Sequence, residues 1–287
     1  MSSINTNTQA MNALSTLRDV NKNLSTTQER IATGLKITSA KDNAAYYSIS
    51  ETMKGDSGMY SSIQEGLTLT ANSLKTARLG AETFVDMINE FTEQVAFGQA
   101  GAMNHADIDK QLKELVSQLE TVLEQSTFNG ENWVNGDRST AGTAVNAVTG
   151  VSRATDGTLA VTTMSVKGVD LKAIHTALKD LSIKDGTGTA TDIETKRAEV
   201  LTTANTQLKA AISAATELGL SEKSVETQQE YLKKLTDTID TGVGAMVDAD
   251  MEAEAARLQA LQVQQQLATQ ALSIANQAPQ NLVSLFR

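Results

Sequence analysis

The feature that most constrains the fold of this chain is its near-lack of proline: 287 residues contain one, Pro279. Because proline interrupts the interior of a helix, the long stretch before Pro279 can form very long uninterrupted helices. Apolar residues make up 40% of the chain but aromatic residues only 3%. Packed cores must therefore be built from Leu, Ile, Val, Met and Ala. A chain of this length typically forms about two domains.

Both ends of the chain carry heptad patterns of the kind that form coiled coils. The N-terminal pattern predicts a helix over 10–35, with one seam row at Leu14, Asn21, Gln28 and Leu35 and a second at Ala10, Leu17, Leu24 and Ile31. The C-terminal rows are Met251, Leu258, Gln265 and Leu272, and Val247, Glu254, Leu261, Ala268 and Ala275. Pro279 is predicted to end this last helix. Polar residues in both seams make an isolated pair of arms marginal in water.

Further helices are predicted between the two ends. One begins after Asp42 as its N-cap and runs to about Phe97. Another begins near Asp107 and stops at Asn129-Gly130, and its narrow apolar stripe consists of Ile108, Leu112, Leu115, Leu119 and Val122. Helical pattern returns from Thr191, where the predicted inner face consists of Leu201, Leu208, Ile212, Ala215, Val225, Leu232, Leu235 and Ile239.

The middle of the chain, over 134–188, has fewer charges and more Thr, Val, Gly, Ser and Ala. Apolar and polar residues alternate over 158–166, which indicates a strand. Residues 171–181 are predicted to form a short helix with Ile174 and Leu178 facing inward. The plan is therefore helices, an insert with short strands, and helices again.

The two arms differ in net charge. Residues 1–41 are net basic and residues 237–287 are net acidic, so we expect the arms to pair with each other. The charges expected at the pairing surface are Arg30, Lys36, Asp248, Asp250 and Glu252. Counted back from both ends of the chain, an antiparallel pairing places Lys36 close to Asp250 and Glu252.

No residue pattern points to catalysis or to a bound cofactor. His105 and His175 show no metal-ligand spacing, and phosphate-loop, dinucleotide-binding and nucleophile-elbow motifs are missing. The acidic cluster at 248–254 lacks the turn-forming glycine of a calcium loop, which favours a charge cluster at a helix N-terminus. Cysteine is absent, which excludes disulfides and thiolate sites. We predict a protein that is not an enzyme and holds no cofactor or metal.

The net charge of −10 argues against binding to nucleic acid or to an anionic membrane, both of which attract positive surfaces. The N-terminus lacks the basic and apolar regions of a secretory signal, and no apolar run is long enough to span a membrane. We therefore expect no nucleic-acid or membrane partner. If the protein leaves the cell, it uses a route that cleaves no recognisable signal.

Motifs at both ends of the sequence resemble those of the bacterial flagellin family. Near the N-terminus they are Ile4-Asn5-Thr6-Asn7 and the run Glu29–Ala45, followed later by Ser126-Thr127-Phe128-Asn129-Gly130. Near the C-terminus they are Asp248–Glu254 and Ala275–Arg287. The central insert is where members of this family vary, and its shortness here is similar to that of alphaproteobacterial flagellins.

The resemblance implies a mainly α fold: a long antiparallel helical rod with coiled-coil terminal arms and a small β-containing insert domain. Paired arms at 1–41 and 245–287 would form the inner core of a filament, 42–134 and 189–244 the rod, and 135–188 a variable, surface-exposed insert. The implied function is that of a structural subunit that self-assembles into the helical flagellar filament used for swimming. Residues expected to pack in the inner core are Ile4, Leu14, Leu17, Leu24, Ile31, Leu35, Met251, Leu258, Leu261, Leu272, Leu282, Val283, Leu285 and Phe286.

The resemblance also implies partners and a location. The partners are further copies of the chain in a helical homopolymer, a flagellar export chaperone, the type III export apparatus, the filament cap and the hook-associated proteins. The location is the extracellular filament, after secretion. Flagellins recognised by the animal innate receptor carry an arginine-bearing stretch in the first rod helix, and because Asp86–Val95 has no arginine, we expect weak or no receptor binding. The alternative function is that of a hook–filament junction protein, which would not form long polymers by itself.

Overall fold

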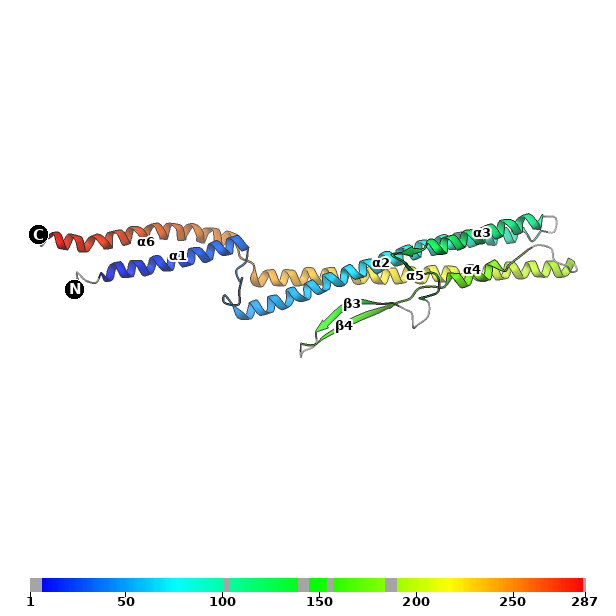
Figure 1. Cartoon of the computed structure of the whole chain (residues 1–287), viewed down its shortest axis with the longest axis horizontal. Helices are drawn as coiled ribbons and strands as arrows, with labels where there is room; N and C mark the ends of the chain where they lie inside the picture. The colour runs from blue at the N-terminus through cyan, green and yellow to red at the C-terminus, as the bar shows by residue number, and fades with distance from the viewer. Residues whose placement is uncertain (1–6, 101–103, 139–144, 154–156, 184–189, 286–287) are drawn as a thin grey trace. The chain divides into compact units, whose positions relative to one another are not determined.

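The computed structural model describes residues 7–100, 104–138, 145–153, 157–183 and 190–285, with the side chains of residues 190 and 278–285 outside the description. Its helices are α1 (Thr8–Thr33), α2 (Ala44–Phe97), α3 (His105–Gln125), α4 (Leu171–Lys179), α5 (Ala190–Val247) and α6 (Met251–Leu285). Its strands are β1 (Thr127–Phe128), β2 (Glu131–Asn132), β3 (Val145–Arg153) and β4 (Leu159–Val166). The predicted mainly α fold with a small β-containing insert is confirmed (Figure 1).

The chain divides into two compact units, one made of residues 1–57 with 237–287 and the other of residues 58–236. The long helices α2 and α5 each contribute to both units. Within the part of the chain that the structure describes, no helix combines the length and the apolar character needed to cross a bilayer.

One hydrophobic core holds the larger unit together. Helix α5 contributes one buried row to this core. From Ala204 onward its members are seven residues apart, and the row consists of Val200, Ala204, Ala211, Leu218, Val225 and Leu232. It meets buried residues of α2 and α3, among them Leu67, Leu74, Phe84, Ile88, Phe91, Leu112 and Leu119. Ile212, predicted on the inner face of α5, is instead 45% exposed. The prediction is wrong by one residue because the buried row passes through the smaller Ala211.

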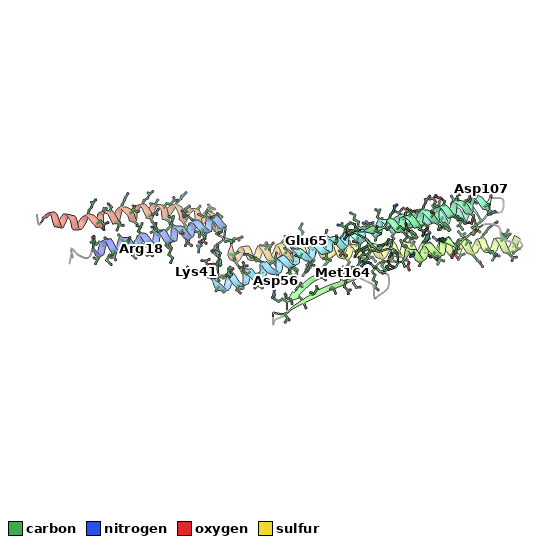
Figure 2. All side chains as sticks on the ribbon, viewed as in Figure 1. Arg18, Lys41, Asp56, Glu65, Asp107 and Met164 are labelled. Carbon is green, nitrogen blue, oxygen red and sulfur yellow. The ribbon has the colours of Figure 1, made fainter. Side chains whose placement is uncertain are left out.

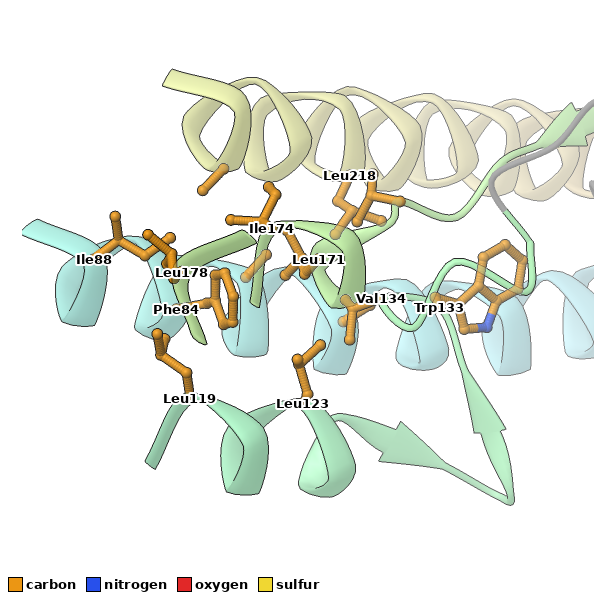
Figure 3. Close-up of a cluster of buried hydrophobic side chains, with 14 of the residues drawn as sticks. Phe84, Ile88, Leu119, Leu123, Trp133, Val134, Leu171, Ile174, Leu178 and Leu218 are labelled. Atoms are coloured by element: carbon orange, nitrogen blue, oxygen red, sulfur yellow. The ribbon is translucent and has the colours of Figure 1, made fainter. Parts of the chain in front are cut away.

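Helix α4 belongs to this same core. Its residues Leu171, Ile174 and Leu178 point between the longer helices, near Phe84 and Leu218 (Figure 3). The short helix predicted here, with Ile174 and Leu178 inward, is confirmed. The insert therefore shares a core with the helices that flank it in the sequence.

The first antiparallel hairpin joins β1 and β2 just after α3. Its turn consists of Asn129 and Gly130, both with positive φ (52° and 80°), a conformation that the Asn-Gly pair adopts readily. The predicted helix stop at Asn129-Gly130 is thus a hairpin turn, and α3 ends earlier, at Gln125. Asn132 then ties the hairpin to α3, because its Nδ2 donates to the Leu123 carbonyl at 2.7 Å.

The second hairpin pairs β3 with β4, with an irregularity between Val148 and Gly150. The strand predicted over 158–166 is β4, whereas β3 was not predicted individually because Gly150 interrupts its pattern. Side chains of the long helices hold β3 in place. The Tyr60 hydroxyl donates to the Val151 carbonyl at 2.8 Å, and Gln228 Nε2 donates to the Thr149 carbonyl at 2.7 Å.

The smaller unit joins α1 and α6 to the adjoining ends of α2 and α5, around a small buried cluster of Ile37, Val243 and Val247. In the loop after α1, the Asp42 carboxylate accepts hydrogen bonds from the backbone and hydroxyl groups of Thr38 and Ser39 at 3.0–3.2 Å. The prediction of Asp42 as N-cap of α2 is therefore wrong. The cap is Asn43, whose Oδ1 accepts from the amides of residues 45 and 46.

Candidate assembly surface on the paired terminal helices

Helices α1 and α6 lie side by side and run antiparallel (Figure 1). Backbone contacts fix them together where α1 ends and α6 begins. Gly34 ends α1 in the left-handed conformation (φ 73°), and its carbonyl accepts from the Ala249 amide at 2.9 Å. The Lys36 amide donates to the Val247 carbonyl at 2.7 Å. The two arms therefore pair within one chain, as the sequence predicts.

The seam that α6 turns toward α1 follows the predicted heptad. Glu254, Leu261, Ala268 and Ala275 are buried, and Leu258, Gln265 and Leu272 are half-buried. Met251, predicted in the same seam, is 45% exposed at the first residue of the helix. The alternating spacing of four and three residues is the spacing at which a helix keeps one stripe against a partner.

The seam of α1 matches the prediction in one row and differs in the other. The predicted row of Ala10, Leu17, Leu24 and Ile31 is half-buried against α6. The second row consists of Ala13, Val20 and Thr27 rather than Leu14, Asn21 and Gln28, and Leu14 is 37% exposed. Val20 and Thr27 are the most buried residues of α1. Their lack of long polar side chains, compared with Asn21 and Gln28, is the signal that could have identified this row.

The ion pair between the arms differs from the predicted one. Arg30 Nη1 lies 3.0 Å from Glu254 Oε1, and Arg257 approaches the same oxygen at 3.8 Å. Among the described residues, no ion pair joins Lys36 to Asp250 or Glu252. Counting back from the chain ends misplaced the register, because Leu35 lies opposite Asp248. Asp250 instead caps α6, accepting from the amides of residues 252 and 253 at 3.1 Å.

Two polar contacts extend this register along the pair. Gln265 Nε2 donates to Asn21 Oδ1 at 2.7 Å, so Asn21 contacts α6 from the edge of the seam. At the far end, Asn7 Nδ2 donates to the Ala275 carbonyl at 2.7 Å. That carbonyl is the one that the missing N–H of Pro279 leaves without a helical donor. The prediction that Pro279 ends the helix is wrong, because α6 continues to Leu285.

Side chains of α1 and α6 also project into solvent, away from the pair (Figure 2). Several of the exposed ones are apolar. On α6 they are Val263, Leu267 and Ile274, which are 55%, 59% and 69% exposed. At 100° per residue these three lie about half a turn from the buried seam. We call them the outer stripe. On α1, Met11 is 62% exposed.

Several predicted core residues lie outside the described part of the chain. They are Ile4 and Phe286, together with the side chains of Leu282, Val283 and Leu285, whose backbone belongs to α6. Asp248 and Glu252 are exposed. Among the described residues, no three His, Asp or Glu side chains gather closely enough to hold a metal ion. The chemistry that this surface offers is therefore apolar association guided by a few polar contacts.

Comparison with known proteins identifies what this architecture resembles. A model of the bacterial flagellin N-terminal helical region matches residues 4–139, and a model of the C-terminal helical region matches residues 198–286. The chain is 38% identical over 288 residues to a flagellin of Brucella melitensis and 34% identical over 320 residues to flagellin C of Rhizobium meliloti, with 100% of each chain covered. A putative flagellar hook-associated protein from Vibrio parahaemolyticus aligns at 10% identity with a TM-score of 0.47, over 72% of this chain and 100% of that one; a likeness at that score distinguishes no function.

Proposed function

Because this chain belongs to the bacterial flagellin family, we propose that its paired helices α1 and α6 are the surface through which its copies assemble. The chain is a structural subunit of the helical flagellar filament that drives motility, of the alphaproteobacterial type. A filament needs a head-to-tail contact that never closes into a ring, so each copy must present two different faces to its neighbours. The paired arms offer such faces.

The outer stripe on α6 is the observation that carries this proposal. Val263, Leu267 and Ile274 are each more than half exposed in the single chain, although α6 already uses its opposite face against α1. Fully burying an aliphatic side chain contributes about 1.5–3 kcal/mol. Because these three side chains are 55–69% exposed, covering the stripe with a neighbouring copy adds more than half of such a contribution at each of them.

The remaining segments take supporting roles in this proposal. Residues 1–41 and 245–287 form the inner core of the filament, residues 42–134 and 189–244 the surrounding rod, and residues 135–188 the insert that faces solvent. The exposed β4 strand, which includes Leu159 and Val161 at 49% and 61% exposure, is compatible with a position at the filament surface. The apolar tail at 282–286 extends the inner core.

The route to the filament is part of the same proposal. The chain is secreted through the flagellar type III export apparatus with the help of an export chaperone, and it assembles beneath the filament cap on a base of hook-associated proteins. A chain without cysteine forms no disulfide that would obstruct passage in an extended form. The stretch Asp86–Val95 presents acidic rather than basic side chains, which supports weak or absent binding to the innate immune receptor.

Seeded elongation tests the proposed surface. Purified chain carrying Leu267→Asp or Ile274→Asp is added to filament fragments, and growth is measured by electron microscopy and sedimentation. We expect elongation to fail, because each change places a charge in the contact between copies. Val161→Asp, on the equally exposed β4, is the matched control and should elongate like the parent chain.

Circular dichroism of each variant checks that the fold is retained. Normal elongation of both stripe variants would count against α6 as the assembly surface. Seeded elongation with the parent chain also distinguishes the two candidate functions. Micrometre-long growth supports a filament subunit, and a stalled end supports a junction protein.

A further inference from the structure

The seam between α1 and α6 does not by itself define one register. Apolar residues recur every seven positions on both helices, and many of them are small: Ala10 and Ala13 on α1, Ala268 and Ala275 on α6. Small side chains form shallow knobs and holes, so sliding one helix by a heptad replaces apolar contacts with similar apolar contacts. Something other than the apolar seam must distinguish the observed register from its neighbours.

Polar contacts mark a single register along the whole pair. From the junction outward, Leu35 lies opposite Asp248, Arg30 pairs with Glu254, Asn21 with Gln265, and Asn7 with Ala275. Among the contacts made by side chains on both helices, the ion pair is the strongest, because Glu254 is 8% exposed and the Arg30 side chain 25%. A hydrogen-bonded pair this far from solvent discriminates more than an exposed one.

A heptad slip would leave the Glu254 carboxylate without its partner. In one of the two nearest slipped registers Arg30 would face Leu261 and Glu254 would face Ile37. In the other Arg30 would face Val247 and Glu254 would face Asn23. One oxygen of Glu254, Oε2, is already buried without a hydrogen-bond partner. Arg30 donates a hydrogen bond to the other oxygen, whereas Arg257, 3.8 Å away and 60% exposed, lies too far for one. An uncompensated buried carboxylate disfavours a register by on the order of a hundredfold.

We propose that the Arg30–Glu254 ion pair selects the register in which α1 and α6 associate. The pair makes a modest contribution to how strongly the arms associate, because bringing both charges out of water offsets much of their attraction. Its main effect is to make the alternatives costly. The register in turn sets where the outer stripe lies relative to α1, and the consequence for assembly rests on the proposed function of these helices.

The cysteine-free sequence allows the register to be read by disulfide formation. The native reporter is the full chain with Asn21→Cys and Gln265→Cys, at two side chains that are in hydrogen-bond contact. Two slipped reporters combine Asn21→Cys with Leu258→Cys or with Leu272→Cys, each one heptad away. Intrachain crosslinks, separated from interchain ones on denaturing gels, are measured before and after seeded elongation.

Each reporter is placed in the parent chain and in the double variant Arg30→Leu with Glu254→Leu. We expect the parent to crosslink only through the native reporter, and the double variant to raise slipped crosslinks at least about tenfold. Arg257→Leu is the matched control: it removes a guanidinium 3.8 Å from the same carboxylate oxygen, with its side chain 60% exposed, and should leave the native pattern unchanged. The reversed pair Arg30→Glu with Glu254→Arg should also keep the native register.

Three results would overturn the proposal. One is a double variant that still crosslinks only through the native reporter. Another is a double variant that crosslinks through none, since the pair would then support association and not register. The third is slipped crosslinking in the reversed variant. A parent chain that shows the native crosslink but fails to elongate would instead contradict the proposed assembly surface and leave the register proposal standing.

Discussion

At the scale of single residues, Asn7 uses both ends of its side-chain amide. Its Oδ1 accepts from the Ala10 amide at 3.0 Å and caps α1, while its Nδ2 donates to the Ala275 carbonyl on α6 at 2.7 Å. The first bond is local, and the second compensates for the donor that Pro279 lacks. One amide thus serves the start of one helix and the last turns of another.

Asn7→Asp separates these two roles, because it keeps the capping oxygen and removes the donor. We expect the free energy of association between α1 and α6 to fall by about 1 kcal/mol. This loss should raise the critical concentration for elongation about fivefold. Adding Pro279→Ala restores a helical N–H for the Ala275 carbonyl and should remove most of this effect. If the double variant is as impaired as Asn7→Asp alone, the carbonyl of residue 275 is not the reason for the loss.

Asp42 is a second residue with a specific role, and in its case that role depends on the charge of the carboxylate. Hydrogen bonds from the Ser39 hydroxyl and the Thr38 and Ser39 amides lower the pKa of its carboxyl below the ordinary value of 3.8. Because the pKa is lowered on folding, the stabilisation is present above the ordinary pKa and is lost as the pH falls through the lowered one. The loop between α1 and α2 should therefore loosen only in strong acid.

The NMR shifts of the Thr38 and Ser39 amides, followed between about pH 6 and pH 2, measure this titration. Both should titrate together with an apparent pKa below 3.8, and Asp42→Asn should abolish the transition. A midpoint at or above the ordinary value would show that these hydrogen bonds do not favour the charged form.

At the scale of elements, α2 contains glycines in two different environments. A methyl group added at Gly80 would lie 2.8 Å from the Cβ of Ser126, the residue that caps α3, whereas Gly66 has nothing within 4 Å of the added atom. Gly80 is therefore required for the close approach of α3 to α2. Gly66 has no such packing role, and its only effect is to make the helix less stable than alanine would.

Gly80→Ala should destabilise the larger unit by about 1–3 kcal/mol through overpacking. Gly66→Ala, the matched control on the same helix, should stabilise it by about 0.5–1 kcal/mol. Urea unfolding followed by circular dichroism measures both changes. Equal effects of the two substitutions would mean that α3 adapts to the added methyl without strain.

Elements with strong periodicity were predictable from the sequence, and contacts between distant segments were not. The seam of α6 follows from the regular Leu258, Leu261 and Leu272. The second row of α1 was missed because Leu14 is more apolar than Ala13, although the partner helix accommodates the smaller residue. The end of α6 was misplaced because Pro279 is compensated by a side chain 268 residues from Ala275. No local pattern carries that information.

The candidate surface was predictable to a similar extent. Opposite net charge correctly indicated that the arms pair, because charge totals do not depend on register. The individual partners do depend on it. The sequence therefore predicts Lys36 beside Asp250 and Glu252, whereas the ion pair in the structure joins Arg30 to Glu254. The outer stripe of Val263, Leu267 and Ile274 is not predicted from the sequence. These three residues fall outside the two heptad rows that define the seam, and the heptad pattern alone gives them no role.

At the scale of the whole molecule, the two units differ in how much apolar surface they bury. The larger one has a core to which α2, α3, α4 and α5 all contribute, while the smaller one has Ile37, Val243 and Val247 at its centre. We expect the larger unit to remain folded when the arms are disturbed, because few of its buried residues depend on them.

Deleting residues 282–287 tests this expectation. The truncated chain should lose elongation onto filament fragments, yet keep the urea midpoint of the larger unit within error of the parent. Tryptophan fluorescence is a suitable readout, because Trp133 is 2% exposed in that core. Normal filaments from the truncated chain would contradict a role for the tail in assembly.

The outer stripe has a consequence for the order of the folding reaction. On the proposed assembly surface, Val263, Leu267 and Ile274, which the single chain leaves in solvent, are buried only when another copy arrives. The last step of its folding is therefore bimolecular, and its rate depends on subunit concentration at the growing end. In dilute solution this step does not occur, so the outer stripe stays exposed until a template supplies the missing neighbour.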